Sequence, residues 1–239
     1  MTELDGRIAL HESFRTSVYH VGQERSPLLV VDDFLRDPDL LIDYAAIHGS
    51  FTSVSDTKYP GVRAPMPQIY SLAVRSFLGA LIAETFRLGT SQLTGELAYF
   101  SLVTTRPEQL QTWQRVPHFD NSDERQLAVL HYLSPRAQGG TSFYRHRATG
   151  FEVIRPHRLV EYMAAVDAEL AARAALPAAY IGGDTDCFER YASVAGTYNR
   201  LIVYRSANLH SPDIAADFPF DAAPRTGRLT ANLFFKFAG

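Results

Sequence analysis

Hydrophobic residues recur at helical spacing in three segments of the chain. The first segment begins after Asp37 and Pro38, which are typical of a helix N-cap and first turn. Each segment ends close to a helix-terminating residue, namely Gly49, Gly89 or Pro177. The spacing predicts three helices, over residues 37–49, 69–88 and 156–176.

The other hydrophobic positions alternate with polar ones, as in β-strands. The last strand is the most regular, because its odd-numbered positions from Leu229 to Phe237 are apolar, whereas Arg228, Thr230 and Asn232 occupy the opposite face. Residues 51–67, rich in Pro, Ser and Thr, are expected to form an irregular loop. The pattern predicts strands over residues 27–31, 96–103, 114–120, 127–133, 141–145, 150–154, 200–205 and 228–237, with short edge strands near residues 8–10 and 17–19.

Several short strands separated by turn residues are typical of a jelly roll, also called a double-stranded β-helix. We therefore predict an α+β fold, mostly β, with a double-stranded β-helix (jelly-roll) core, N-terminal supporting helices and one helical insertion. The chain is expected to be a single domain. In it, residues 1–94 would support a core of residues 95–239, and residues 156–177 would form the insertion.

Composition and charge narrow the class of protein. The 239 residues, of which 46% are hydrophobic, can bury a sizeable core. A net charge of −3, with both signs spread along the chain, gives no basis for a nucleic-acid or membrane partner. The single cysteine, Cys187, excludes an internal disulfide and a cysteine-based metal site. With no signal sequence and no membrane-spanning run, the protein is expected to be cytoplasmic.

A first candidate for chemistry is the sequence His118-Phe119-Asp120. In an extended segment, alternate side chains point the same way, so His118 and Asp120 would share a face and Phe119 would pack on the other. An imidazole and a carboxylate are two of the three ligands in the 2-His-1-carboxylate site that holds Fe(II). His-x-Asp occurs often by chance, so this motif alone is a weak signal.

Two further candidates lie towards the C-terminus. His210 lies just beyond the predicted strand 200–205, and Arg228 opens the polar face of the last strand. The planar guanidinium of arginine suits bidentate binding of a carboxylate, so Arg228 is predicted to point into a pocket.

The order of these residues resembles the Fe(II)/2-oxoglutarate-dependent dioxygenases, and in particular their prolyl hydroxylase-like branch. That order is His-x-Asp, then a distal histidine, then Arg-x-Thr on the final strand. The strand around Tyr99 resembles the tyrosine-bearing strand of that branch. Tyr132-Leu-Ser, followed by Gly139-Gly140 and Phe143, resembles its "YLN…GG…F" pattern. The likeness covers about residues 95–239 and extends to a group of uncharacterised bacterial members of the superfamily.

The resemblance implies a hydroxylase that uses Fe(II) and O₂ and couples them to the decarboxylation of 2-oxoglutarate. By resemblance, the iron ligands are His118, Asp120 and His210. The distal carboxylate of 2-oxoglutarate would be bound by Arg228, in a cosubstrate site completed by Tyr132, Tyr99, Thr230 and Asn232. The segment between His210 and Arg228 is longer than usual for the family, so the nearby Arg225 stays an alternative for this role.

Two other readings of the function stay open. One is a cupin-like iron dioxygenase that does not use 2-oxoglutarate, and the other is a catalytically inert ligand-binding module on the same fold. No motif identifies the substrate, which is expected to be a small molecule or a peptide, and the oligomeric state is unknown. Residues expected near the substrate are Tyr59, Arg63, Trp113, Arg115, Asn121 and Arg145. For Arg145, an ion pair within the protein is an equally good prediction.

Three other histidines are assigned structural or surface positions. His131 lies on the strand face opposite Tyr132 and is predicted to be a hydrogen-bonded structural residue. His146 and His157 lie near strand ends and are expected in solvent.

Overall fold

The computed structural model describes residues 4, 6–53, 59–136, 138–172 and 176–238. None of the helices in these ranges is long and apolar enough to cross a membrane. The helices are α1 (Asp39–His48), α2 (Gln68–Thr85) and α3 (Leu159–Ala171), with short 3₁₀ turns at Pro107–Gln109, Thr112–Gln114 and Pro156–Arg158. The strands are β1 (Arg15–Val21), β2 (Ser26–Asp32), β3 (Thr52–Ser53), β4 (Gly61–Pro65), β5 (Leu93–Val103), β6 (Gln126–Tyr132), β7 (Thr141–His146), β8 (Phe188–Val194), β9 (Leu201–Arg205), β10 (His210–Pro212) and β11 (Leu229–Phe237).

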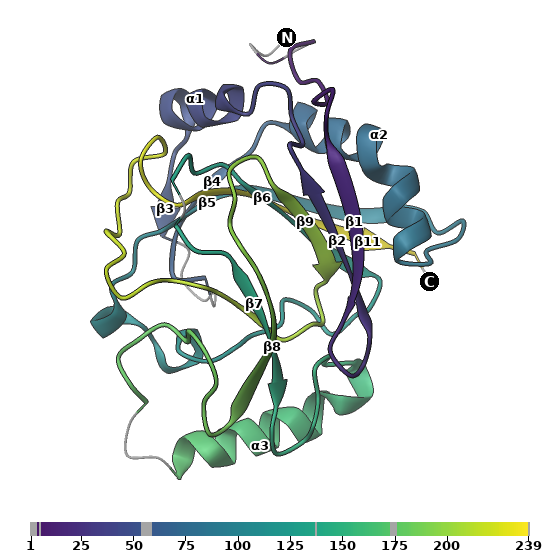
Figure 1. Ribbon diagram of the computed structural model, residues 1–239. Helices are drawn as coiled ribbons and strands as arrows, with labels where there is room; N and C mark the ends of the chain where they lie inside the picture. Colours follow the sequence, from purple (N-terminus) through teal and green to yellow (C-terminus); the bar gives the residue numbers. More distant parts are fainter. Residues whose placement is uncertain (1–3, 5, 54–58, 137, 173–175, 239) are drawn as a thin grey trace.

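The strands form two antiparallel sheets. The large sheet has eight strands in the order β1-β2-β9-β6-β11-β5-β4-β3, and the small sheet has three in the order β10-β7-β8. Helices α1 and α2 lie on one side of the large sheet, and β7, β8 and α3 lie on the other (Figure 1). Two facing antiparallel sheets with helices outside them are the predicted mostly-β, double-stranded β-helix architecture.

The main hydrophobic core lies between the large sheet and the helices α1 and α2. The alternation of β11 explains which residues it receives: Leu229, Ala231, Leu233 and Phe235 all point into this core and are at most 1% exposed. Because alternate side chains of a strand face opposite ways, the polar residues of β11 must face the small sheet. The pattern in the sequence thus predicts the two faces of the central strand correctly.

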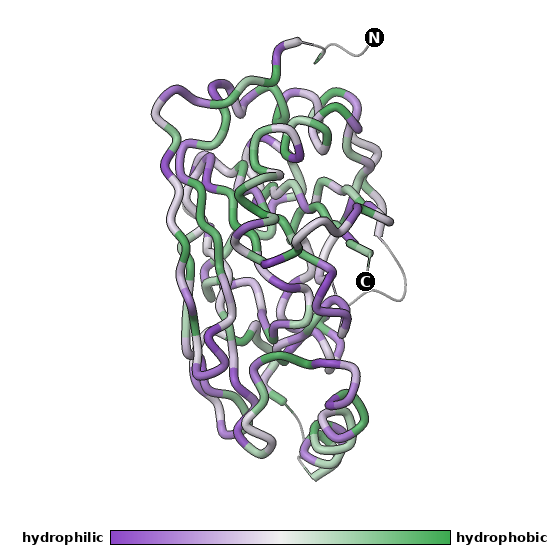
Figure 2. Tube along the Cα trace, turned by 90° about the vertical axis from the view of Figure 1, so that its right-hand side faces the viewer, coloured by the Kyte–Doolittle hydropathy of each residue, from purple (hydrophilic) through white to green (hydrophobic). Residues whose placement is uncertain are grey.

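The small sheet packs on both sides. Phe143 of β7 packs against Tyr204 on the inner face of the large sheet. The next residue, Tyr144, packs with Tyr162 and Val166 of α3. Helix α3 lies at the end of the molecule opposite the N-terminus, as the side view shows (Figure 2). The predicted helical insertion therefore covers the outside of the small sheet.

The three predicted helices are confirmed, with different ends. Gly49 is the C-cap of α1, as predicted, and its N–H donates to the carbonyl of Ala45. Helix α2 stops at Thr85, earlier than predicted, because Arg87 adopts a positive φ of 53° that a right-handed helix excludes. Part of the predicted end of the third helix, residues 173–175, lies outside the described residues.

The prediction of a strand over residues 114–120 is wrong. The segment begins in a 3₁₀ turn and continues in an irregular path, with one isolated antiparallel bridge between His118 and His210. Pro117 has no N–H to donate, so continuous pairing is interrupted next to His118. The separate hydrogen bond from the Asp120 N–H to the carbonyl of Ser206 holds the other end of the motif.

Two other predictions are corrected, and one strand was not predicted. Residues 150–154 form an isolated bridge between Val153 and Asn208 in place of a strand. The expected irregular loop 51–67 contains β3 and β4, although residues 54–58 lie outside the described part of the chain. Strand β8 was not predicted, because Glu189, Arg190 and Ser193 interrupt its apolar residues and leave no clear alternation.

His131 confirms its predicted structural role. It is fully buried, its Nε2 lies 3.1 Å from Asn199 Oδ1, and its Nδ1 lies 2.9 Å from Tyr70 Oη. Asn199 Oδ1 also accepts a hydrogen bond from the Leu35 N–H, so it acts as an acceptor and Nε2 must carry the proton. Nδ1 is then the acceptor for the Tyr70 hydroxyl, so a neutral imidazole satisfies both neighbours.

We predict that His131 makes the protein less stable in mild acid. Burial lowers the pKa of His131 to about 4, so between pH 6.5 and pH 4 the unfolded chain binds a proton that the folded chain does not. The free energy of unfolding should therefore fall by roughly 2 kcal/mol from pH 7 to pH 5 through this residue. Urea unfolding of the wild type and of His131→Gln at both pH values measures the difference, and an equal loss in both proteins would contradict the prediction.

Candidate metal centre

His118, Asp120 and His210 lie together although the last two are ninety positions apart in the sequence. His118 Nε2 lies 3.8 Å from Asp120 Oδ1, and His210 Nε2 lies 3.7 Å from Asp120 Oδ2. The imidazole centroids are 4.3 Å apart. Among the described residues, this is the group of histidine, cysteine and acidic side chains whose ligand atoms are close enough to hold one ion.

The backbone brings the two histidines together. The His118 N–H donates to the carbonyl of His210 at 2.9 Å, and the His210 N–H donates back to the carbonyl of His118 at 2.8 Å. Residues exchanging both bonds in an antiparallel pair lie directly opposite each other, with neighbouring side chains. His210 begins β10, so the small sheet fixes the position of this pair.

The hydrogen bonds of His210 also fix its tautomer. Its Nδ1 lies 2.9 Å from the backbone carbonyl of Asn208. A carbonyl oxygen can only accept, so Nδ1 carries the proton and Nε2 presents a lone pair towards Asp120. Metal-binding histidines commonly have this arrangement, in which the second nitrogen donates to a carbonyl or carboxylate and orients the ring.

The ligand atoms of the three side chains lie within 4.8 Å of one another, so the group could hold one metal ion. Two atoms bound to one ion at about 2.1 Å can lie at most about 4.2 Å apart. The separations of 3.7 and 3.8 Å between the imidazole nitrogens and the Asp120 carboxylate oxygens are within this limit. Two imidazoles and one carboxylate are the donor set of the non-haem Fe(II) facial triad, which leaves coordination positions open for other ligands.

The His-Asp-His cluster opens into a cavity of about 70 Å³ between the two sheets. The large sheet contributes most of its wall through β11, β6, β9 and β4. Lining residues include Tyr59, Arg63, Leu130, Thr141, Tyr204, Arg228, Thr230, Asn232 and Phe234. The polar face of β11 therefore lines the same space as the cluster, as its alternation predicts.

Arg228 is buried in the wall of this cavity, with 3% of its surface exposed. Its Nε donates to the carbonyl of Gln138 at 3.0 Å and its Nη2 donates to the carbonyl of Gly140 at 2.8 Å. The guanidinium carbon lies 5.8 Å from the centroid of the Tyr132 ring. No acidic residue in the described ranges forms an ion pair with Arg228, so the cation is held in place without a counter-charge of its own.

The two glycines beside Arg228 are required by the backbone. Gly139 has a φ of 81°, and a Cβ there would lie 1.7 Å from the carbonyl oxygen of Asp213. A Cβ on Gly140 would lie 1.8 Å from the carbonyl oxygen of Val194. The Gly-Gly pair thus lets this loop pack closely enough to present its carbonyls to Arg228.

Arg225, the alternative to Arg228, lies elsewhere. It is exposed and forms an ion pair with Asp43 of α1. Its charge is therefore directed at the protein surface, and it does not line the cavity. The geometry favours Arg228, in agreement with the strand parity.

The phenols around the cavity are neutral at physiological pH. Burial raises the pKa of Tyr59 to about 12, against the opposing effect of the nearby Arg228, and burial likewise raises the pKa of Tyr132 to about 12. Tyr132 donates its hydroxyl hydrogen to Thr141 at 2.8 Å. The Tyr59 hydroxyl is buried beside Ser101 and Thr230, whose side-chain hydrogen bonding opposes the rise in its pKa.

Of the other residues predicted for the cosubstrate site, Thr230 and Asn232 line the cavity, whereas Tyr99 and Tyr132 do not. Asn232 Nδ2 donates to Ser101 Oγ at 2.6 Å and to Thr230 Oγ1 at 3.3 Å. Tyr99 places its ring 5.4 Å from the guanidinium carbon of Arg63. The structure thus brings Thr230 and Asn232 to the cavity wall, and the binding roles of all four residues stay predictions.

The residues predicted near the substrate divide into two groups. Tyr59 and Arg63 line the cavity, but Trp113, Asn121 and Arg145 do not. Trp113 packs in the hydrophobic cluster around α3. Asn121 Oδ1 accepts a hydrogen bond from the Asp123 N–H, and Arg145 forms ion pairs with Glu152 and Glu189, which satisfies the second of its two predicted roles.

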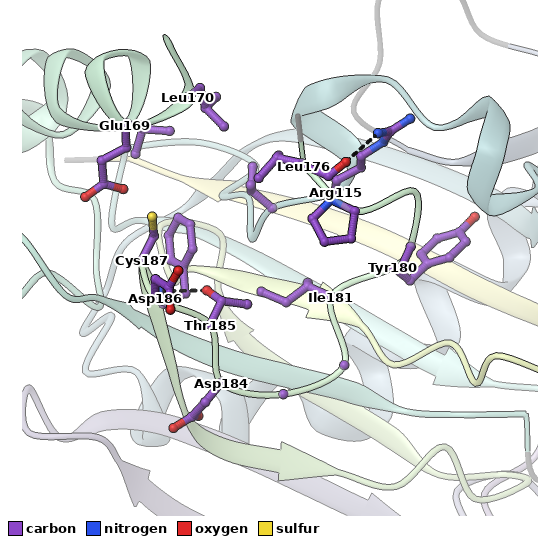
Figure 3. Close-up of a pocket in the computed structure, with 17 residues that line it drawn as sticks. Arg115, Glu169, Leu170, Leu176, Tyr180, Ile181, Asp184, Thr185, Asp186 and Cys187 are labelled. Atoms are coloured by element: carbon purple, nitrogen blue, oxygen red, sulfur yellow. Dashed lines mark hydrogen bonds between the residues drawn. The ribbon is translucent and has the colours of Figure 1, made fainter. Parts of the chain in front are cut away.

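Arg115 belongs to a second cavity, of about 320 Å³, between α3 and residues 176–188 (Figure 3). Its side chain donates to the carbonyls of Leu110 and Leu176 at 3.0 and 3.1 Å. No member of the His-Asp-His cluster lines this larger cavity, whose wall is mostly apolar. The larger cavity is therefore separate from the candidate metal centre.

The prediction for His146 is wrong, and Tyr204 is a cavity residue that was not predicted. His146 is fully buried, not solvated, and its Nε2 lies 3.2 Å from Glu169 Oε2 of α3. Tyr204 lines the cavity with its ring centroid 4.9 Å from that of His210. Its place on the same face of β9 as Ile202 follows from strand alternation, which is the signal that could have identified it.

A family model matches residues 12–235 of the chain, and its description is a family of unknown function, DUF6445. The chain belongs to DUF6445. No curated protein sequence matches this DUF6445 member.

Solved structures resemble the DUF6445 chain at low sequence identity. HygX from Streptomyces hygroscopicus, with nickel, 2-oxoglutarate and hygromycin B bound, has a TM-score of 0.50 and 11% identity, covering 88% of this chain and 83% of HygX. A dioxygenase of N-substituted L-amino acids from Burkholderia ambifaria has a TM-score of 0.43 and 14% identity, covering 96% and 100% of the two chains. At this identity, the likeness to HygX shows the fold alone, and it confirms the predicted double-stranded β-helix.

We predict that His118→Ala abolishes binding of a divalent transition metal, because it removes one of the three ligands and the remaining imidazole and carboxylate do not make up the donor set. Isothermal titration with Ni(II) or anaerobic Fe(II) measures the affinity, and circular dichroism checks that the fold persists. The exposed His157 provides a matched control, since His157→Ala removes an imidazole outside the cavity. Unchanged affinity in His118→Ala would place the ion elsewhere.

Proposed function

We propose that this DUF6445 protein is an Fe(II)- and 2-oxoglutarate-dependent oxygenase that hydroxylates a small-molecule or peptidyl substrate. The observation that carries the proposal is the buried Arg228, which has no acidic partner among the described residues and lines the same cavity as the His-Asp-His cluster. A buried cation is strongly destabilising unless an anion compensates it. A dicarboxylate bound between Arg228 and the His-Asp-His cluster would supply the compensating negative charge.

Each wall of the cavity has a part in this proposal. His118, Asp120 and His210 would hold Fe(II), which when bound supplies the site for 2-oxoglutarate and O₂ chemistry. Arg228 would bind the distal carboxylate of 2-oxoglutarate, because its hydrogen bonds to the carbonyls of Gln138 and Gly140 orient the guanidinium. HygX binds nickel and 2-oxoglutarate on a similar fold, which supports the choice of cosubstrate.

The apolar part of the wall would limit access of water. Leu130, Tyr204 and Phe234 line the cavity beside the cluster. Their side chains offer few polar groups that could bind water in this part of the cavity. Electrostatic attraction between Arg228 and an anionic ligand is stronger where water is excluded. Assignment to the prolyl hydroxylase-like branch in particular stays a prediction.

The two alternative functions account less well for Arg228. A cupin-like iron dioxygenase without a keto acid would need the metal cluster but would leave the buried cation without a role. An inert binding module would need neither the tautomer fixed at His210 nor three converging ligands. Anaerobic addition of Fe(II) and then 2-oxoglutarate separates them, because the visible charge-transfer band of a bidentate keto acid on iron is expected for the proposed function. Metal binding without the band would favour the cupin-like enzyme, and no metal binding would favour the inert module.

Arg228→Ala is predicted to raise the Kd for 2-oxoglutarate by at least tenfold, because losing one member of a buried charge pair costs on the order of 2–5 kcal/mol. Titration of the charge-transfer band on the Fe(II)-loaded protein measures the affinity. Arg225→Ala is the matched control, since it removes an exposed arginine that pairs with Asp43. If Arg225→Ala weakened binding and Arg228→Ala did not, the proposed anchor would be wrong.

A panel of amino acids, peptides, nucleosides and sugars should contain one class that stimulates succinate release above the uncoupled background. The reacting C–H bond of the substrate must lie beside the His-Asp-His cluster. The shape of the cavity therefore selects molecules that can place a C–H bond there. Succinate is measured after addition of Fe(II), 2-oxoglutarate and each compound. Stimulation by polynucleotides alone would contradict a small-molecule or peptidyl substrate.

A further inference from the structure

The cavity contains a second arginine whose charge the cosubstrate does not use. Arg63 lies on β4, which adds to the large sheet beside β5. The strand register places Arg63, Ser101, Thr230 and Tyr132 opposite one another across four neighbouring strands. Paired residues share a face of the sheet, so Arg63 belongs to the same polar row as the residues that adjoin Arg228.

The immediate surroundings of Arg63 are aromatic and not acidic. Its guanidinium carbon lies 4.7 Å from the centroid of the Tyr59 ring and 5.4 Å from that of Tyr99. Its Nε is buried without a hydrogen-bond partner. In the described ranges of the chain, no carboxylate forms an ion pair with Arg63. The aromatic rings stabilise the cation in part, but an unpaired buried N–H is unfavourable and is the kind of group that a ligand oxygen satisfies.

The two arginines have different ring contacts. Arg228 lies over Tyr132, whereas Arg63 lies over Tyr59 and Tyr99, although the charges of both arginines reach Tyr59. Among the described residues that line the cavity, the one acid is Asp120, which belongs to the metal cluster. One dicarboxylate bound between Arg228 and the metal would leave Arg63 uncompensated.

We propose that Arg63 binds a carboxylate of the substrate, so that the oxygenase acts on small carboxylic acids. The planar guanidinium, already stacked on Tyr59 and Tyr99, presents its Nε edge for a bidentate carboxylate contact. The inference rests on the proposed function, because it takes Arg228 as the anchor of 2-oxoglutarate. It adds a substrate class that the metal cluster and Arg228 do not specify.

The test compares N-acetylated amino acids with their uncharged primary carboxamides, which differ in one charge. Binding is measured by isothermal titration to the Ni(II)-loaded protein, with and without 2-oxoglutarate, and succinate release is measured in parallel with Fe(II). In the wild type, at least one acid should bind about tenfold or more tightly than its carboxamide, the scale of a charge-assisted bidentate pair. Arg63→Gln should remove that preference while the Kd for 2-oxoglutarate changes less than about twofold.

Two further variants control the test. Arg63→Lys keeps the charge but loses the fork, so it should retain a reduced preference for acids. Arg225→Gln removes an exposed arginine outside the cavity and should retain the full preference. Circular dichroism checks that each variant is folded.

Three results overturn the inference. The first is a wild type that prefers no acid over its carboxamide, and the second is an unchanged preference in a folded Arg63→Gln protein. The third is a rise in the Kd for 2-oxoglutarate in Arg63→Gln as large as in Arg228→Gln, which would assign Arg63 to the cosubstrate. Failure of the proposed function is distinct from these, because it appears as no binding of 2-oxoglutarate to wild type, while the titrations without 2-oxoglutarate still measure the acid preference.

Discussion

The two faces of β11 organise the molecule. This strand lies between β6 and β5 near the middle of the eight-stranded sheet, with its apolar side chains against α1 and α2 and its polar ones in the cavity. A slip of one residue in its register would exchange the faces, burying Arg228 and Thr230 in the core and exposing Leu229 to the cavity. The hydrophobic core thus determines which polar groups reach the candidate site, and stability and chemistry depend on the same alternation.

The His-Asp-His cluster depends on a different kind of restraint. Asp120 and His118 lie in an irregular segment, and two reciprocal backbone hydrogen bonds hold His118 against His210 at the start of β10. Arg228 directly precedes β11 of the large sheet while His210 begins β10 of the small sheet, so the distance between the cluster and the arginine depends on how the sheets pack. Phe143 and Tyr204 form an edge-to-face aromatic contact, with centroids 5.1 Å apart, between those sheets. That contact links the two halves of the candidate site.

Sequence reasoning succeeds where one local pattern decides the outcome. The alternation of 228–237 predicts both faces of β11, and helical spacing predicts α1 and α2, because burial of an apolar face dominates these elements. It fails where pairing is non-local: Pro117 interrupts the predicted strand 114–120, and edge strand β8 has no regular apolar face. The burial of His146 under α3 likewise depends on a tertiary contact with Glu169 that no neighbouring residue signals.

The protonation of the tyrosines decides the charge of the cavity. Tyr59 and Tyr132 adjoin Arg228, and a phenolate at either position would neutralise the cation within the protein. Burial raises the pKa of both to about 12, so at neutral pH each keeps its proton and contributes a dipole without a charge. Arg228 therefore keeps its positive charge in a wall where the described acid, Asp120, faces the histidines. An anionic ligand in this cavity would then meet the charge of Arg228 without a compensating negative charge from Tyr59 or Tyr132.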